Sequence, residues 1–360
     1  MSLVSRRSAP LLGLALFFAL AGGAEAQPFG AWLTLAGPTS GYIQVPSSAD
    51  LNPASAITVE AWVNLIDANG GACSSIVGKK WTDAWFLGIC GTQLRSYIRG
   101  YDSTGLVVPI RTFRDAGRIP PGQWTHIAVT FDGTTRKHYI NGELVGSWVE
   151  PGPLTATADP VRIGSDVAHM HTPAGAIDEV RLWNYARTEA QLRASLNGLT
   201  GPTSGLVALW GLNASAVDAA GGHNGALAGS GGHYFTFPVA ITCGSSTASS
   251  LCLDGRFAIT ARYRVGAPGT PEGNAMTAGC ANPGSGLFWF FSPDNWEVMV
   301  KIVNACALNS RYWVFSAATT NVFYRLEVFD IRAGVNKIYF NYPGPPAPAV
   351  TDTGAFATCP

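Results

Sequence analysis

The sequence predicts an all-β protein, an antiparallel jelly-roll sandwich followed by a second, smaller β-sandwich domain. Short runs of β-branched and aromatic residues alternate with turn residues, and Asp132-Gly133 and Asn141-Gly142 are strong hairpin signals between such runs. The composition agrees, because only 13% of the residues are charged while the chain holds 42 Gly, 23 Pro and 11 Trp. This apolar and aromatic composition excludes a disordered chain.

Residues 1–26 have the features of a secretory signal peptide. Arg6 and Arg7 form a basic region, the apolar run that follows is short for a membrane span, and Ala24-Glu25-Ala26 is a cleavage site. We therefore expect a secreted or periplasmic protein, in a bacterial host, with no membrane span. The formal net charge of zero gives no support for a nucleic-acid partner.

Residues 27–237 are expected to form the first domain. Its strands are predicted where apolar and polar residues alternate between turn signals. They lie at 42–45, 57–65, 85–89, 94–98, 124–131, 137–140, 143–149, 161–164 and 176–183. After the last strand, Thr188 and Gln191 have the spacing of a capping box, and Leu192 supplies an apolar contact for a short helix.

These segments together resemble the laminin-G-like domain, a concanavalin A-like jelly roll of lectins and glucanases. The segments that carry the resemblance are ITVEAWV (57–63), QWTHIAVTFDG (123–133), YINGELVGS (139–147), RIGSD (162–166) and AIDEVRLWN (176–184). The resemblance implies two antiparallel sheets packed face to face and a disulfide between Cys73 and Cys90. Residues 205–229 resemble a flanking element of such domains, and we expect them to add a strand and an ordered loop rather than begin a second repeat.

Residues 238–360 are expected to form the second domain. Four dense β-type blocks, at 251–265, 286–306, 311–331 and 336–342, resemble a module at the end of exported bacterial proteins. Within the second block, the apolar residues from Val298 to Val303 predict a strand buried on both sides.

The chain has seven cysteines, and disulfides are expected in an exported protein. In the second domain the favoured pairs are Cys243 with Cys252 and Cys306 with Cys359, which would leave Cys280 free. Other pairings of these five cysteines remain open.

The resemblance implies a binding protein with two kinds of candidate site. Many domains of this family bind calcium through Asp side chains, and Asp178 holds the matching position, although Ala36 stands where the family has a second carboxylate. Sugars stack on exposed aromatic rings unless those rings fill the core. The candidate ligand-binding residues are Trp81, Trp85, Tyr97 and Tyr101.

No enzymatic activity is expected. Related glycosidases need two carboxylates on one face, whereas Asp178 and Glu179 are adjacent on a strand and Glu60 stands alone in its strand. We expect a secreted, non-catalytic protein that binds a glycan or a cell-surface or matrix component, through carbohydrate recognition or adhesion. The alternatives are a structural or interaction protein of a surface assembly and, less favoured, a divergent glycoside hydrolase. No cofactor other than calcium is expected.

Overall fold

The structure is a computed structural model that describes most of the chain. The described residues are 30–37, 40–67, 73–80, 84–98, 113–166, 172–199, 203–229, 233–236, 243–344 and 347–360. The predicted signal peptide and the expected domain boundary at 237–238 lie outside them. Trp81, Tyr101 and the side chain of Cys280 lie outside them as well.

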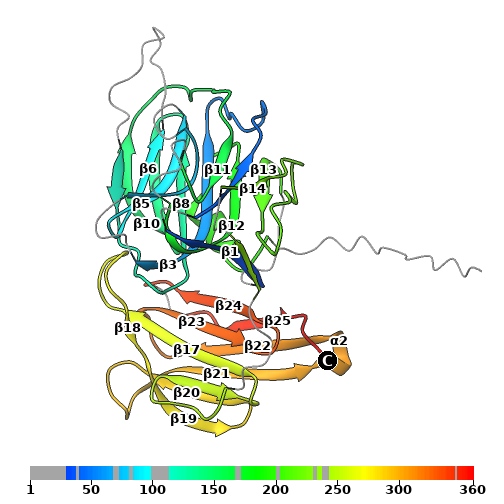
Figure 1. The fold of residues 1–360 in the computed structure, drawn as a ribbon. Coiled ribbons are helices and arrows are strands. Elements are labelled where there is room, and N and C mark those ends of the chain that lie inside the picture. Colours follow the sequence, from blue (N-terminus) through cyan, green and yellow to red (C-terminus); the bar gives the residue numbers. More distant parts are fainter. Residues whose placement is uncertain are drawn as a thin grey trace, which may run out of the picture.

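The first half of the chain forms a jelly roll of two antiparallel sheets (Figure 1). The larger sheet has eight strands, ordered β10 (Glu143–Val149), β9 (Thr135–Ile140), β8 (Thr125–Phe131), β3 (Ile57–Asp67), β12 (Ala174–Trp183), β1 (Ala31–Ala36) and β15 (His233–Thr236), with β13 (Leu206–Trp210) paired to β12. The seven-stranded sheet is ordered β14 (Ala226–Ala228), β2 (Tyr42–Val45), β11 (Val161–Ile163), β4 (Cys73–Lys79), β5 (Trp85–Cys90), β6 (Gln93–Ile98) and β7 (Arg114–Ala116).

Alternation along each strand separates the core from the outer faces. In β3, Val59, Ala61 and Val63 belong to the core between the sheets, whereas Glu60 and Trp62 belong to the opposite, outer face of the larger sheet. Those outer residues are also fully buried. Something must therefore cover the outer face of the larger sheet.

Two elements cover it. One is helix α1 (Glu189–Ala194), which follows β12 and has the predicted capping box between Thr188 and Gln191. Its buried residue is Leu192, which clusters with Ala128 and Tyr139 of the sheet. The other is the second domain.

The second domain is also a sandwich of two antiparallel sheets. The inner sheet, which faces the jelly roll, is ordered β16 (Ser250–Leu253), β17 (Phe257–Arg264), β23 (Phe323–Asp330) and β24 (Val335–Asn341), with β18 (Gly273–Asn274) paired to β17. The other sheet is ordered β19 (Met276–Asn282), β20 (Ser285–Trp289), β21 (Trp296–Ala305), β22 (Arg311–Ala318) and β25 (Val350–Phe356). A four-residue helix, α2 (Cys306–Asn309), follows β21.

The prediction that β21 is buried on both sides is wrong. Val298, Val300 and Ile302 are buried, but Met299 is 47% exposed and Lys301 is exposed. A strand in a two-layer sandwich has only one packed face, so apolar character on the other face does not show burial.

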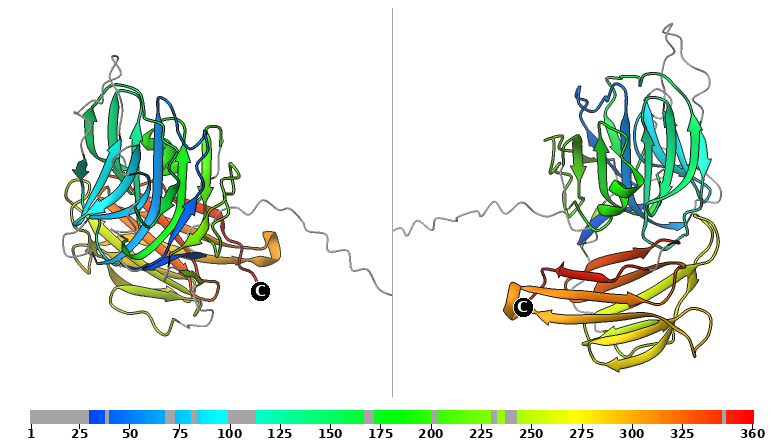
Figure 2. Two further views of the ribbon diagram at one scale, coloured as in Figure 1. Left: turned by 45° about the horizontal axis from the view of Figure 1, so that its top comes forward. Right: turned by 180° about the vertical axis from the view of Figure 1, so that it is seen from behind.

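The inner sheet docks against the larger sheet of the jelly roll, so that the two sandwiches are stacked (Figures 1 and 2). Trp62, Trp124 and Leu196 of the first domain form one apolar cluster with Ile338 of β24. The Asn197 side chain extends this contact, because it donates to Ile338 O at 2.8 Å and accepts from Ile338 N at 3.0 Å.

Residues 205–229 belong to the jelly roll, as predicted. β13 joins the larger sheet and β14 joins the seven-stranded sheet. The loop between them is ordered by Asp218, whose carboxylate accepts hydrogen bonds from the backbone N–H groups of Leu209, Ala220, Gly221 and His223.

Within the described parts of the chain three disulfides are present, and they are the three expected pairs: Cys73–Cys90, Cys243–Cys252 and Cys306–Cys359. The first links the paired strands β4 and β5, and the last ties the end of the chain to the end of β21. Among the described residues, neither helix approaches the length and apolar character that crossing a membrane requires.

Candidate functional site

Of the aromatic residues predicted to bind a ligand, the structure describes Trp85 and Tyr97, and these two do not share a surface. Trp85 is only 3% exposed and fills the core, where its Nε1 donates to Leu51 O at 3.3 Å. Tyr97 is half-buried, and its ring centroid lies 5.1 Å from that of Phe113. In the strand register Tyr97 is opposite Phe86, whereas Trp85 is opposite Ile98. Tyr97 and Trp85 therefore lie on opposite faces of the seven-stranded sheet.

Asp178 is fully buried in β12, and its Oδ1 accepts a hydrogen bond from Glu179 N at 2.9 Å. It begins a β-bulge in which Glu179 adopts a positive φ of 49°. Nowhere in the described parts of the chain do three or more His, Cys, Asp or Glu residues gather as a metal site would require. Calcium binding at Asp178 stays a prediction.

Glu60 is the centre of a buried ionic network beneath α1. Its Oε1 accepts from Trp183 Nε1 at 2.7 Å and from Arg187 Nη1 at 2.6 Å. Its Oε2 lies 3.1 Å from His126 Nε2. Arg181 lies 3.9 Å from Glu60 and pairs with Glu179 at 2.7 Å. β12 and the loop that follows it thus supply most of this network.

Burial alone would raise the pKa of Glu60, but the His126 hydrogen bond and the charges of Arg181 and Arg187 outweigh it and lower the pKa to about 2. Burial lowers the pKa of His126, which is therefore a neutral imidazole at neutral pH. A carboxylate held so firmly in its ionised form is a poor proton donor, and all its strong contacts are structural.

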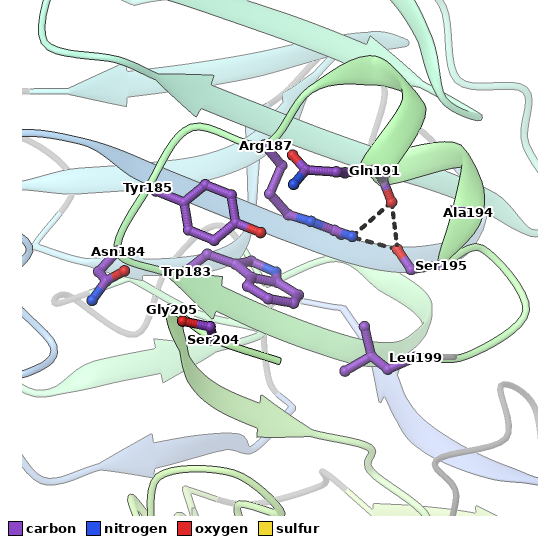
Figure 3. Close-up of a pocket in the computed structure, with 10 residues that line it drawn as sticks. All are labelled: Trp183, Asn184, Tyr185, Arg187, Gln191, Ala194, Ser195, Leu199, Ser204 and Gly205. Carbon is purple, nitrogen blue, oxygen red and sulfur yellow. Dashed lines mark hydrogen bonds between the residues drawn. The ribbon is translucent and has the colours of Figure 1, made fainter. Parts of the chain in front are cut away.

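An open pocket of about 590 Å³ lies beside this network, where β12 ends and α1 begins (Figure 3). We call it the strand–helix pocket. It is lined by Trp183, Asn184, Tyr185, Arg187, Gln191, Ala194, Ser195, Leu199, Ser204 and Gly205. Its volume falls within the range of small-molecule sites, roughly 300–1,000 Å³.

Backbone and side-chain contacts fix the walls of the strand–helix pocket. Asn184 N donates to Gly205 O at 2.9 Å, which joins the end of β12 to the residue before β13. Arg187 Nη1 donates to Ser195 Oγ at 2.9 Å, and Arg187 Nη2 donates to Gln191 O at 2.6 Å (Figure 3). The arginine therefore joins the sheet to α1, and its position does not depend on a ligand.

The pocket combines groups that recognise hydroxyl-rich molecules. Tyr185 is half-buried, and its ring makes an edge contact with Trp183 at 5.7 Å between centroids. Asn184 and Ser204 are exposed and offer an amide and a hydroxyl. Arg187 is 6% exposed, and its Nε has no hydrogen-bond partner in the described structure. The pocket thus offers donors, an acceptor and one aromatic ring.

The sequence at the end of the last predicted jelly-roll strand was evidence for the fold, and it did not predict the strand–helix pocket there. Asn184 ends the segment AIDEVRLWN (176–184), and Tyr185 and Arg187 lie between that segment and the predicted capping box at Thr188. A signal was present, since a short polar and aromatic loop joins a strand to a capped helix. Ser204, however, follows α1 in the sequence, and it reaches the pocket only because β13 pairs with β12.

Comparison with known proteins finds a family match for the first domain. Residues 37–193 match a family model described as the concanavalin A-like lectin/glucanases superfamily, in its laminin G group. Mouse pappalysin-1 is 35% identical over 77 residues, and human pappalysin-1 is 32% identical over 81 residues. These matches cover 20% and 21% of this chain, and the chain spans only 5% of the length of either relative.

Similar solved structures include a candidate carbohydrate-binding protein from Bacteroides ovatus, with 22% identity, a TM-score of 0.46, and coverage of 60% of this chain and 62% of that one. Another is the LG4-5 domain pair of the mouse laminin α1 chain, with 12% identity, a TM-score of 0.36, and coverage of 88% and 84%. Both are similar to this chain at low sequence identity. The family match together with the two-sheet architecture shows that residues 37–193 are a laminin-G-like domain of the concanavalin A-like superfamily.

Proposed function

We propose that this protein is an exported, non-catalytic carbohydrate-binding protein and that the strand–helix pocket takes part of a glycan. The observation that carries the proposal is this pocket, built on the family's jelly roll and lined by Asn184, Tyr185, Arg187 and Ser204. A sugar ring offers hydroxyl groups that both donate and accept, and such groups match an amide and a hydroxyl.

A binding role accords with the state of the nearby carboxylates. Glycoside hydrolysis needs two carboxyl groups with separate roles and free access to substrate. Glu60 is instead bonded to Trp183, Arg187 and His126, and it is fully buried. Glu179 is bonded to Arg181. These groups hold α1 on the sheet, which supports a binding site more than a catalytic one.

Export is supported by the disulfides. Three pairs of cysteines are bridged, and such bridges persist in oxidising compartments such as the periplasm or the extracellular space. Together with the predicted signal peptide, they favour encounter with cell-surface, matrix or environmental glycans.

A printed glycan array tests the proposal. We expect the full chain to bind a subset of oligosaccharides, and Asn184→Ala and Tyr185→Ala to weaken that binding by about tenfold, the equivalent of one hydrogen bond or one ring contact. Asn295→Ala is the matched control, since Asn295 is exposed and does not line this pocket. Absence of any glycan binding would contradict the proposed function, and binding that neither pocket variant weakens would place the site elsewhere, with Tyr97→Ala as the next variant.

A further inference from the structure

A second hollow lies between the two domains. This interdomain cleft has a volume of about 380 Å³. The jelly roll contributes Trp32, Thr34, Asn64, Ile66, Trp124, Gly175 and Ala176, and the inner sheet of the second domain contributes Glu327, Phe329 and Asn336. Neither domain alone forms it, because its walls come from β1, β3 and β12 on one side and from β23 and β24 on the other.

The contacts between the domains fix the two walls relative to each other. Arg325, which is 2% exposed, donates from Nη1 to Trp124 O at 2.7 Å and from Nη2 to Gln123 Oε1 at 2.9 Å. Arg264 Nη2 donates to both carboxylate oxygens of Glu143, at 2.8 and 2.7 Å. The cleft is thus held open by rigid contacts and needs no ordering when a ligand enters.

The cleft contains polar groups that the protein itself leaves unsatisfied. Asn336 is 3% exposed, and its Nδ2 donates to Glu327 Oε1 at 2.6 Å. Its Oδ1 has no hydrogen-bond partner in the described structure, and the same is true of Thr34 Oγ1 on the facing wall. Buried acceptors without partners are rare in folded proteins, because each one lacks the hydrogen bonds that water would supply. Both atoms belong to residues that line the hollow, which favours a ligand that donates hydrogen bonds.

Aromatic and apolar side chains supply the rest of the wall. Trp32 is half-buried and lies edge-on to Trp124, with 5.6 Å between ring centroids. Ile66, at 73% exposed, is one of the most exposed large apolar side chains in the described structure. Gly175 also lines the cleft, and the close approach of β3 requires a glycine there, because a Cβ would lie 2.3 Å from Asn64 O. Tryptophan and phenylalanine beside an amide and a carboxylate form the kind of surface on which a sugar ring stacks while its hydroxyls bond at the edge.

We infer that the interdomain cleft is a second saccharide site, which takes a neutral sugar ring against Trp32 and Phe329 and accepts its hydroxyl hydrogens at Asn336 Oδ1. The inference rests on the proposed carbohydrate-binding function. Among the described residues that line the cleft, Glu327 is the one that carries a charge, so a uronic or sialic acid is disfavoured. Carbohydrate binding at this site requires the second domain, which gives that domain a part in recognition.

Asn336→Ala is the sharpest variant, because it removes the unsatisfied acceptor and leaves the apolar walls in place. On an array of neutral oligosaccharides, we expect a subset of glycans to lose about tenfold in affinity with Asn336→Ala. Asn295→Ala, which removes an asparagine that also donates to a glutamate of the second domain, is expected to leave those glycans unchanged. The melting temperature of Asn336→Ala shows whether the variant is folded, and loss of the hydrogen bond to Glu327 is expected to lower it by a few degrees.

Hydroxyl-radical footprinting with a neutral oligosaccharide retained by the array gives a readout that needs no variant. We expect the bound sugar to protect Trp32 and Phe329 from oxidation. Glycan binding that Asn336→Ala leaves intact, or that protects Tyr185 but neither cleft aromatic, overturns the cleft site and leaves the proposed function standing. A native chain that binds no glycan overturns both.

Discussion

At the scale of single residues, Glu60 shows how one buried carboxylate organises a sheet face. Its two carboxylate oxygens form hydrogen bonds with Trp183 of β12, Arg187 of the following loop and His126 of β8. A charge buried this deeply is tolerated only because each oxygen has strong partners. The same residue therefore sets both the position of α1 and part of the acid stability of the protein.

Replacing Glu60 with Gln is expected to destabilise the protein strongly. The neutral amide would leave Arg187 and Arg181 buried without their counter-charge, which costs about 3–5 kcal/mol in such pairs. Urea unfolding of the variant measures the loss. Glu189→Gln is the control, because its ion pair with Arg193 on the surface of α1 is worth at most about 0.5 kcal/mol. Equal losses in both variants would contradict this account.

Acid is expected to destabilise the protein already at pH values well above those at which most carboxylates titrate. Burial, followed by the nearby charge of Arg136, lowers the pKa of His138 from 6.5 to about 3. The unfolded chain therefore binds a proton near pH 6.5 that the folded chain refuses until near pH 3, so stability falls across that interval. From pH 7 to pH 5 the loss from His138 is about 2 kcal/mol.

His126 acts in the same direction, since burial lowers its pKa too. Glu60 adds a further loss only below its usual range, as the pH falls from 4.5 towards its folded pKa of about 2. Urea unfolding at pH 7, 6 and 5 measures the slope, and His138→Gln should flatten it, because Gln can bond to Ser96 without titrating. A variant with the native slope would show that His138 is not the titrating group.

At the scale of elements, α1 combines a predictable local signal with contacts that only the fold reveals. The capping box between Thr188 and Gln191 was predicted from spacing, and it is present. We expect Thr188→Ala to cost about 1 kcal/mol through loss of the N-cap, and Thr188→Ser to restore most of it. Thermal unfolding of the three proteins measures this. A Ser variant as unstable as the Ala variant would show that the methyl group, not the hydroxyl, matters.

The sequence predicted strands, hairpins and the Cys243–Cys252 disulfide because each is encoded by neighbouring residues. The alternation in 57–65 placed β3 correctly, and the separation of Cys243 and Cys252 by nine positions suited a short bridge. It could not predict that Trp62 and Trp124 would be covered by β24, because that contact joins residues from different domains. Trp85 has the same limit, since its burial depends on which face of the sheet it occupies.

At the scale of the whole molecule, the two sandwiches form one unit rather than two linked domains. Apolar contact at Ile338 is flanked by the hydrogen bonds of Asn197 and Arg325 and by a cation–π contact of 3.6 Å between Arg193 and the ring of Tyr342. Interfaces of this apolar kind restrict domain motion. We expect calorimetry of the full chain to show one cooperative transition that contains both domains.

The buried ion pair between Glu143 and Arg264 tests how the domains are coupled. The side chains are 5% and 4% exposed, and burial raises the pKa of Glu143 even beside the arginine, so the pair itself contributes little net stability. Glu143→Gln alone, however, would leave the arginine buried and unpaired, at a cost of about 3 kcal/mol or more.

Adding Arg264→Met should recover much of that loss, because the methionine keeps the apolar contact with the ring of Phe323, over which the guanidinium lies at 3.9 Å. A double-mutant cycle by calorimetry measures the coupling. Strictly additive effects would mean that the two residues are not in contact in solution. Separation of the single transition into two in Glu143→Gln, with one transition restored in the double variant, would locate the coupling of the domains at this pair, and with it the rigidity that the interdomain cleft requires.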